Sequence, residues 1–221
     1  MSSYSSDELQ SVDVLVSTRN KERALVSARR NIQNGSIPAN RILLDVSSPV
    51  SYSRYLLFQK AQTPWVVTLD DDVEVEEGWF DLLKSYITPG VVGVEGMINY
   101  EGKPRELQRG ERSYGCWDAI LRTDVFRSWH PSKWVRSWED YQIGQHALNY
   151  GKWVRIPVKG RHPLNLRRSA LWGGKGYRDL FGWRSILFMG KLSAGIVRYA
   201  LKEDYYGMIQ NYYTMKGILS K

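Results

Sequence analysis

The sequence predicts an α/β fold, with a mostly parallel β-sheet flanked by helices and with amphipathic helices at the C-terminal end. Short valine-rich runs alternate with helical patterns through the first hundred residues. This alternation is typical of parallel strands joined by crossover helices. Periodic apolar positions return after residue 179, beyond a segment rich in glycine and basic residues.

The first half of the chain supplies the alternating elements. Strands are predicted where a β-branched run is followed by polar or turn residues. These runs are 12–16, 41–46, 65–69 and 91–94. Helices are predicted between them, over 22–32, 52–61 and 79–86. Asn34-Gly35 ends the first of these helices as a stop signal.

The second half is less regular. Residues 138–150 predict a helix that opens on Glu139-Asp140, and 153–158 predict a strand. Glycines and basic residues over 164–178 predict a loop, which would serve as a flap over a ligand. We therefore expect an α/β domain over residues 1–165 and a basic, aromatic, helical appendage over residues 166–221.

Composition excludes several classes of protein. The single cysteine, Cys116, excludes a disulfide framework and a multi-cysteine zinc site. No apolar run reaches the roughly 18–20 residues of a membrane span. The N-terminus is polar and acidic and has no secretory signal. We therefore expect a cytoplasmic protein.

Positive charge gathers at the C-terminal end. Residues 1–110 carry 12 basic and 15 acidic side chains (−3), 111–160 carry 8 and 5 (+3), and 161–221 carry 11 and 3 (+8). A localised basic segment favours an anionic partner. With its aromatic residues and helical spacing, 166–221 predicts peripheral contact with the cytoplasmic membrane face. Packing on the α/β domain or a dimer contact is the alternative.

Polar residues follow three of the predicted strands, at 17–20, 45–48 and 70–72. Ligands bind at the carboxyl ends of parallel strands, so these clusters predict one site. The three carboxylates at 70–72 repel one another unless a cation neutralises them. Oxygen ligands suit Mg²⁺ or Mn²⁺, and a metal held by carboxylates can also hold a diphosphate. An exposed acidic turn that caps the next helix is the alternative.

Four segments together resemble the inverting glycosyltransferases of family 2, which have the GT-A fold. The segments are VDVLVSTRNKE (12–22), RILLDVSS (41–48), VVTLDDDVEV (66–75) and WEDYQIGQHALNYG (138–151). The resemblance covers roughly residues 10–163. It implies metal-dependent transfer of one sugar from a UDP- or GDP-sugar to an acceptor hydroxyl. The Gln/Arg-x-x-Arg-Trp motif of processive synthases is absent after the Glu-Asp pair, so we expect non-processive transfer.

The resemblance also assigns donor-binding residues. The loop after the first strand would touch the nucleotide, and the strand-end aspartate at 45 would contact the base. Because the family's Asp-Asp-Gly-Ser run is DVSS here, the choice of base stays open. Arg54 would lie near the uridine or diphosphate, Asp70 or Asp71 would face the ribose, and Asp72 would bind Mn²⁺ or Mg²⁺. The full nucleotide-sugar set is Ser17, Thr18, Arg19, Asn20, Asp45, Arg54, Asp70 and Asp71.

The remaining roles concern the reaction and the acceptor. By the same resemblance Asp140 is the catalytic base that takes the proton of the acceptor hydroxyl. Simple helix N-terminal electrostatics is the alternative for this aspartate. His162 is a candidate metal ligand, with surface packing as its alternative. The candidate acceptor-binding residues, chosen because aromatic faces stack on sugars, are Trp117, Asp118, Trp138 and Glu139.

We expect the acceptor to be a glycan or a lipid-linked saccharide. Other classes of function stay open: a nucleic-acid or membrane-surface binding protein on an inactive glycosyltransferase-like scaffold, and a nucleotidyltransferase. Against nucleic-acid binding, the basic residues are confined to one end and no recognition motif is present. Against a nucleotidyltransferase, residues 17–22 are not a glycine-rich basic loop.

Overall fold

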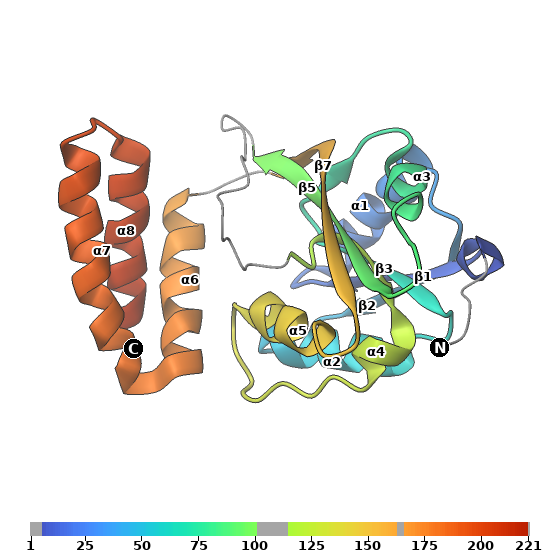
Figure 1. The fold of residues 1–221 in the computed structure, drawn as a ribbon, viewed down its shortest axis with the longest axis horizontal. Coiled ribbons are helices and arrows are strands. Elements are labelled where there is room, and N and C mark those ends of the chain that lie inside the picture. The colour runs from blue at the N-terminus through green and yellow to red at the C-terminus, as the bar shows by residue number, and fades with distance from the viewer. Residues whose placement is uncertain (1–5, 101–114, 163–165, 221) are drawn as a thin grey trace. The chain divides into compact units, whose positions relative to one another are not determined.

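The computed structural model describes residues 6–100, 115–162 and 166–220. The chain forms two compact units, neither of which is continuous in sequence. The α/β unit contains Met1–Ser48, Tyr52–Pro131 and Asp140–Pro163. The helical unit contains Pro49–Ser51, Ser132–Glu139 and Leu164–Lys221. Figure 1 shows the elements of both.

A seven-stranded sheet forms the centre of the α/β unit, within the residues described, in the order β2-β1-β3-β6-β5-β7-β4. The strands are β1 (Val12–Ser17), β2 (Ala39–Asp45), β3 (Trp65–Leu69), β4 (Glu74–Val75), β5 (Val91–Tyr100), β6 (Asp118–Arg122) and β7 (Lys152–His162). Five of these strands run in one direction, and β4 and β6 run in the opposite direction. The prediction of a mostly parallel sheet flanked by helices is therefore confirmed.

Helices cover both faces of this sheet because its strands are apolar on both sides. They are α1 (Lys21–Asn34), α2 (Val50–Lys60), α3 (Trp79–Lys84), α4 (Thr123–Arg127) and α5 (Glu139–Ala147), with a 3₁₀ turn, η1 (Ser6–Leu9), before β1. Val14 and Val16 pack in one core with α1 and α3. Leu15, between them, packs in a second core with α2, α4 and α5. This alternation is the period of two that a strand imposes.

A buried carboxylate links the edge of the sheet to the loop before β3. Asp13 is fully buried and accepts hydrogen bonds from Arg41 Nε (3.0 Å) and from the backbone N–H of Gln62 (2.7 Å). Burial acts to raise the pKa of Asp13, but these hydrogen bonds and the charge of Arg41 hold it below its ordinary value.

The helical unit contains α6 (Leu166–Phe181), a 3₁₀ turn η2 (Gly182–Arg184), α7 (Ser185–Ala200) and α8 (Tyr205–Leu219). Helix α8 packs against both α6 and α7 (Figure 1). The loop and flap expected over 164–178 are wrong, because this stretch belongs largely to α6. A Cβ on Gly174 would clash with the carbonyl oxygen of Thr214, so this glycine permits close packing of α6 on α8. Glycine at a tight helix contact looks the same in a sequence as glycine in a loop.

One stretch of the described chain, Arg167–Ala200, is long and apolar enough to cross a membrane by length and composition. The sequence predicts no apolar run as long as a membrane span. The structure differs because this stretch joins two helices, α6 and α7. The two helices are separated at Gly182, which has a left-handed φ of 58°. Only 17% of the apolar window is buried.

Hydrogen bonds to α6 hold the segment that precedes α5. Arg136 binds both carboxylate oxygens of Asp179 at 2.8 Å. Trp138 Nε1 donates to the carbonyl oxygen of Gly173 (2.9 Å). Trp138 also has a φ of 70°, a conformation that costs a non-glycine residue about 1–3 kcal/mol. The bonds to α6 therefore hold a strained backbone immediately before Glu139 and Asp140.

Candidate functional site

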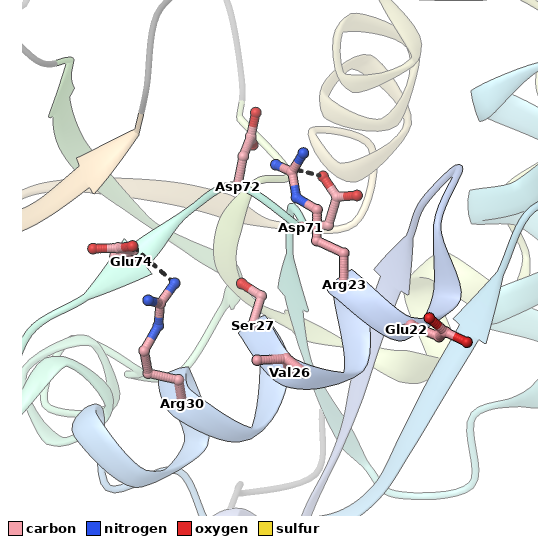
Figure 2. Close-up of a pocket in the computed structure, with 8 residues that line it drawn as sticks. All are labelled: Glu22, Arg23, Val26, Ser27, Arg30, Asp71, Asp72 and Glu74. Atoms are coloured by element: carbon pink, nitrogen blue, oxygen red, sulfur yellow. Dashed lines mark ion pairs between the residues drawn. The ribbon is translucent and has the colours of Figure 1, made fainter.

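The three aspartates after β3 have different surroundings. Arg54, only 5% exposed, donates to Asp70 Oδ1 (2.8 Å) and to the carbonyl oxygen of Cys116 (3.0 Å). Asp71 instead accepts from Thr18 Oγ1 (2.6 Å) in the loop after β1. It also faces the Arg23 guanidinium of α1 at 3.8 Å (Figure 2). Asp72 points away from this pair. Asp70 and Asp72 are thus available to one ligand, while Asp71 between them binds Thr18 of the loop after β1.

His162 joins Asp70 and Asp72 because of how β7 pairs. The end of β7 runs antiparallel to β4, with Glu74 opposite Arg161. Asp72 lies two residues before β4, and this register therefore carries His162 to its side. His162 Nε2 lies 3.3 Å from Asp72 Oδ1. One ligand atom from each of Asp70, Asp72 and His162 lies within 4.8 Å of the others.

These three side chains fit a divalent cation. Carboxylate oxygens suit Mg²⁺ and Mn²⁺, and an imidazole nitrogen suits first-row transition metals better than Mg²⁺. Burial and the neighbouring Asp72 raise the pKa of Asp70, although Arg54 and His162 oppose this. Burial also acts to raise the pKa of Asp72, but the hydrogen bond and charge of His162 lower it overall. A cation would relieve the repulsion between the two carboxylates.

The residues predicted to bind the nucleotide lie at the ends of β1 and β2. Ser17 Oγ donates to Ser53 Oγ (2.8 Å), and the hydroxyl of Ser53 contacts the carbonyl oxygen of Asp45 (3.2 Å). The Asp45 carboxylate accepts from Ser47 N (2.8 Å) and lies 3.5 Å from Lys60 Nζ. Burial acts to raise the pKa of Asp45, but these partners lower it overall.

The two remaining loop residues are exposed, and one has a structural role. Asn20 caps α1, since its side-chain oxygen accepts from the backbone N–H of Arg23 (3.0 Å). Arg19 is exposed beside it. Sequence reasoning missed Ser53, which lies on α2 and holds the end of β1.

An open cleft of about 460 Å³ lies between α1 and the loop after β3. Its lining residues are Glu22, Arg23, Val26, Ser27, Arg30, Asp71, Asp72 and Glu74 (Figure 2). Sequence reasoning missed the α1 side of this cleft. Arg23 and Arg30 are seven residues apart with Ser27 between them, and this helical spacing was the signal that they share a face.

The predicted catalytic base, Asp140, is the second residue of α5 and is partly exposed. Its carboxylate accepts from the backbone N–H of Tyr141 (2.9 Å). Glu139 before it is 7% exposed. Asp140 belongs to the α/β unit and Glu139 to the helical unit, so the chain passes from one unit to the other at this pair.

The candidate acceptor residues divide between the two units, with Trp117 and Asp118 in the α/β unit and Trp138 and Glu139 in the helical unit. The half-buried Trp117 lies beside the candidate metal ligand His162, and the two rings are 6.0 Å apart. Asp118 is fully buried in β6, opposite Leu69 of β3. Trp138 packs its ring on Tyr177 of α6 and donates a hydrogen bond to Gly173 of the same helix. Of the two that belong to the α/β unit, Trp117 is the residue that lies at the candidate metal site.

No family model and no curated protein matches this chain in sequence. Among solved structures, a mannosyltransferase from Pyrobaculum calidifontis, in complex with GDP-Man and Mn²⁺, is similar to it with a TM-score of 0.63. The sequences are 9% identical, and the match covers 94% of this chain and 86% of that one. TarS 1–349 from S. aureus matches with a TM-score of 0.47, at 10% identity over 94% of this chain and 92% of that one. The fold of this chain is thus the GT-A-like fold of a known glycosyltransferase.

Proposed function

We propose that this protein is a metal-dependent inverting glycosyltransferase that moves one sugar from a nucleoside-diphosphate sugar to an acceptor hydroxyl. The observation that carries the proposal is the cluster of Asp70, Asp72 and His162 at the carboxyl end of β3. In a sheet of this type, ligands bind at that edge. The fold of the mannosyltransferase supports the same activity.

Asp72, His162 and Asp70 would hold Mn²⁺ or Mg²⁺. When bound, such a cation stabilises negative charge on a diphosphate leaving group. Arg54 positions Asp70 through its bond to one carboxylate oxygen. Asp71, oriented by Thr18, would face the ribose, and Asp45 with Ser17 would form the nucleotide side of the site. Arg19 and Asn20 would complete that side from the loop after β1.

Asp140 would act as general base on the acceptor. As its carboxylate takes the hydroxyl proton, the acceptor oxygen bonds to C1 of the sugar from the face opposite the diphosphate. The bond from C1 to the diphosphate oxygen breaks in the same displacement, so the anomeric centre inverts. Trp117 would offer its ring to a sugar near this point.

The test is a thermal-shift panel of GDP, UDP, GDP-mannose, CMP and ATP, each with and without Mn²⁺. We expect one diphosphate to raise the Tm only with Mn²⁺, because a ligand that binds the folded state stabilises it. Asp72→Asn and His162→Gln should remove that shift. Asp124→Asn is the control, since Asp124 is an exposed acidic residue of α4 paired with Arg122.

No Tm shift with any nucleotide, with or without Mn²⁺, would remove the support for an active donor site. A Mn²⁺-dependent shift that survives Asp72→Asn would instead place the cation elsewhere. We also propose that transfer is non-processive, that the acceptor is a glycan or lipid-linked saccharide, and that the enzyme works at the cytoplasmic membrane face.

A further inference from the structure

Helix α7 has one face packed and the opposite face exposed. Ser185 and Leu192 are buried, and the side chain of Asn211 on α8 donates to the carbonyl oxygen of Leu192 (3.2 Å). Helix α7 packs mainly against α8, and its contact with α6 is slight. Among the described residues of the helical unit, its other side is therefore left without a packed neighbour.

The exposed face carries a continuous apolar stripe. Its large members on α7 are Leu187 (72% exposed) and Val197 (61%). Trp183 (72%) in η2 and Leu201 (83%), the residue after the helix, continue the stripe at its two ends. Gly190 and Ala194 fill the intervening positions, and successive members are three or four residues apart. This spacing places Leu187, Gly190, Ala194 and Val197 on one side of α7. Ile186, 62% exposed, widens the stripe.

A row of cations runs beside this stripe. Arg184, Lys191 and Arg198 are spaced by seven residues, and Lys202 follows one turn later. All four are exposed. No acidic residue occurs between positions 180 and 202. An apolar stripe bordered by lysine and arginine is typical of a helix that lies in the interface of an anionic membrane.

The charge distinguishes between the two partners that such a face could bind. A second copy of this chain would bring four more cations to the interface and no acidic residue from this segment to pair with them. An anionic bilayer instead accepts the apolar stripe among its acyl chains and pairs the cations with its headgroups. The break at Gly182 and the cations within the apolar window favour a helix that lies on the membrane over one that spans it.

We propose that α7 is a membrane-docking helix, with Leu187 and Val197 entering an anionic leaflet and Arg184, Lys191 and Arg198 binding its headgroups. This inference gives the proposed membrane contact a defined surface. It does not depend on the sugar-transfer activity, because none of its residues lies in the candidate metal site. Its failure would leave the nucleotide and Mn²⁺ test unaffected.

The experiment measures co-sedimentation of the full chain with vesicles of phosphatidylcholine alone or mixed with phosphatidylserine. We expect strong binding to the mixed vesicles and weak binding to the neutral ones. The triple variant Arg184→Gln/Lys191→Gln/Arg198→Gln should bind the mixed vesicles roughly 100-fold more weakly. Leu187→Glu should weaken binding at least about tenfold, because it places a carboxylate in the apolar stripe.

Leu82→Glu is the matched control, since Leu82 is a 42%-exposed leucine on α3 in the α/β unit. It should bind vesicles as the unaltered chain does, and all variants should melt at similar temperatures. Equal binding to neutral and mixed vesicles, or unchanged binding by Leu187→Glu, would overturn the proposal. A dimer in sedimentation velocity that Leu187→Glu dissociates would also overturn it and identify an interface between copies.

Discussion

Asp140 provides the sharpest test at the scale of a single residue. Asp140→Asn keeps the shape of the side chain and removes its basicity. We expect Mn²⁺-dependent nucleotide binding to stay unchanged while kcat falls roughly 10²–10⁴-fold, the usual contribution of a general base. Thermal shift measures the binding, and release of nucleoside diphosphate measures the turnover. Normal turnover by this variant would remove Asp140 from its role.

Asp13 predicts how stability depends on pH. The pKa of this carboxyl is lower in the folded chain than in the unfolded chain, where it is about 3.9. The ionised Asp13 therefore contributes fully to the free energy of unfolding above about pH 4. This contribution is lost as the pH falls through the lower pKa of the folded chain. Asp13→Asn should lower the free energy of unfolding by about 2 kcal/mol at pH 7, because it loses the charged hydrogen bonds from Arg41 and Gln62.

Urea titrations at pH 7 and pH 3 measure this difference, which should shrink at the lower pH. Asp124→Asn serves again as the control, because an exposed pair contributes less than about 1 kcal/mol. An Asp13→Asn chain that loses equal stability at both pH values would show that packing, rather than charge, sets the cost.

Two glycines make a matched pair at the scale of the helices. Gly174→Ala places a methyl group against the Thr214 carbonyl of α8, and we expect a loss of about 2 kcal/mol from overpacking. Gly190→Ala adds the same group on α7 where nothing lies within 4 Å, and should gain about 0.5–1 kcal/mol. Thermal melts of the two variants should move in opposite directions. Equal shifts would contradict the close packing of α6 on α8.

The elements that the sequence predicts are those with strong local patterns. Strand β3 is found at the predicted bounds, Trp65–Leu69, because polar and turn residues mark both of its ends. Strand β6 was not predicted, since Arg122 leads directly into α4 without a turn residue. Its antiparallel place between β3 and β5 depends on pairing between distant segments, which no local pattern records.

In the candidate site, too, local patterns are predictable from the sequence and contacts between distant segments are not. The strand-end aspartates are visible in the sequence because three carboxylates after an apolar strand are unusual. That Asp70 and Asp72 meet His162 depends on the register of β7 on β4, far away in the chain. Asp71 instead binds Thr18 of the loop after β1, another contact between distant segments. The resemblance suggested His162, and the structure explains how it reaches Asp72. The α1 side of the cleft stayed hidden because its arginines look like an ordinary solvated face.

At the scale of the whole molecule, the helical unit should matter for transfer more than for donor binding. A chain ending at residue 165 keeps Asp70, Asp72 and His162 but loses the partners of Arg136 and Trp138. We expect it to retain a Mn²⁺-dependent Tm shift with the donor nucleotide and to lose at least about tenfold in kcat. The full chain assayed in parallel is the reference. Full turnover by the shortened chain would show that these contacts do not position Asp140.

The scattered make-up of the helical unit also bears on how such a protein can evolve. Its packing partners are encoded in three places, at 49–51, at 132–139 and after residue 163. The α6–α8 helices are therefore not a cassette that a single recombination event can exchange. A change in α6 at Asp179 has to be matched at Arg136, whose guanidinium binds its carboxylate. We therefore expect the α/β unit and the helical unit to be inherited together, with changes in one matched by changes in the other.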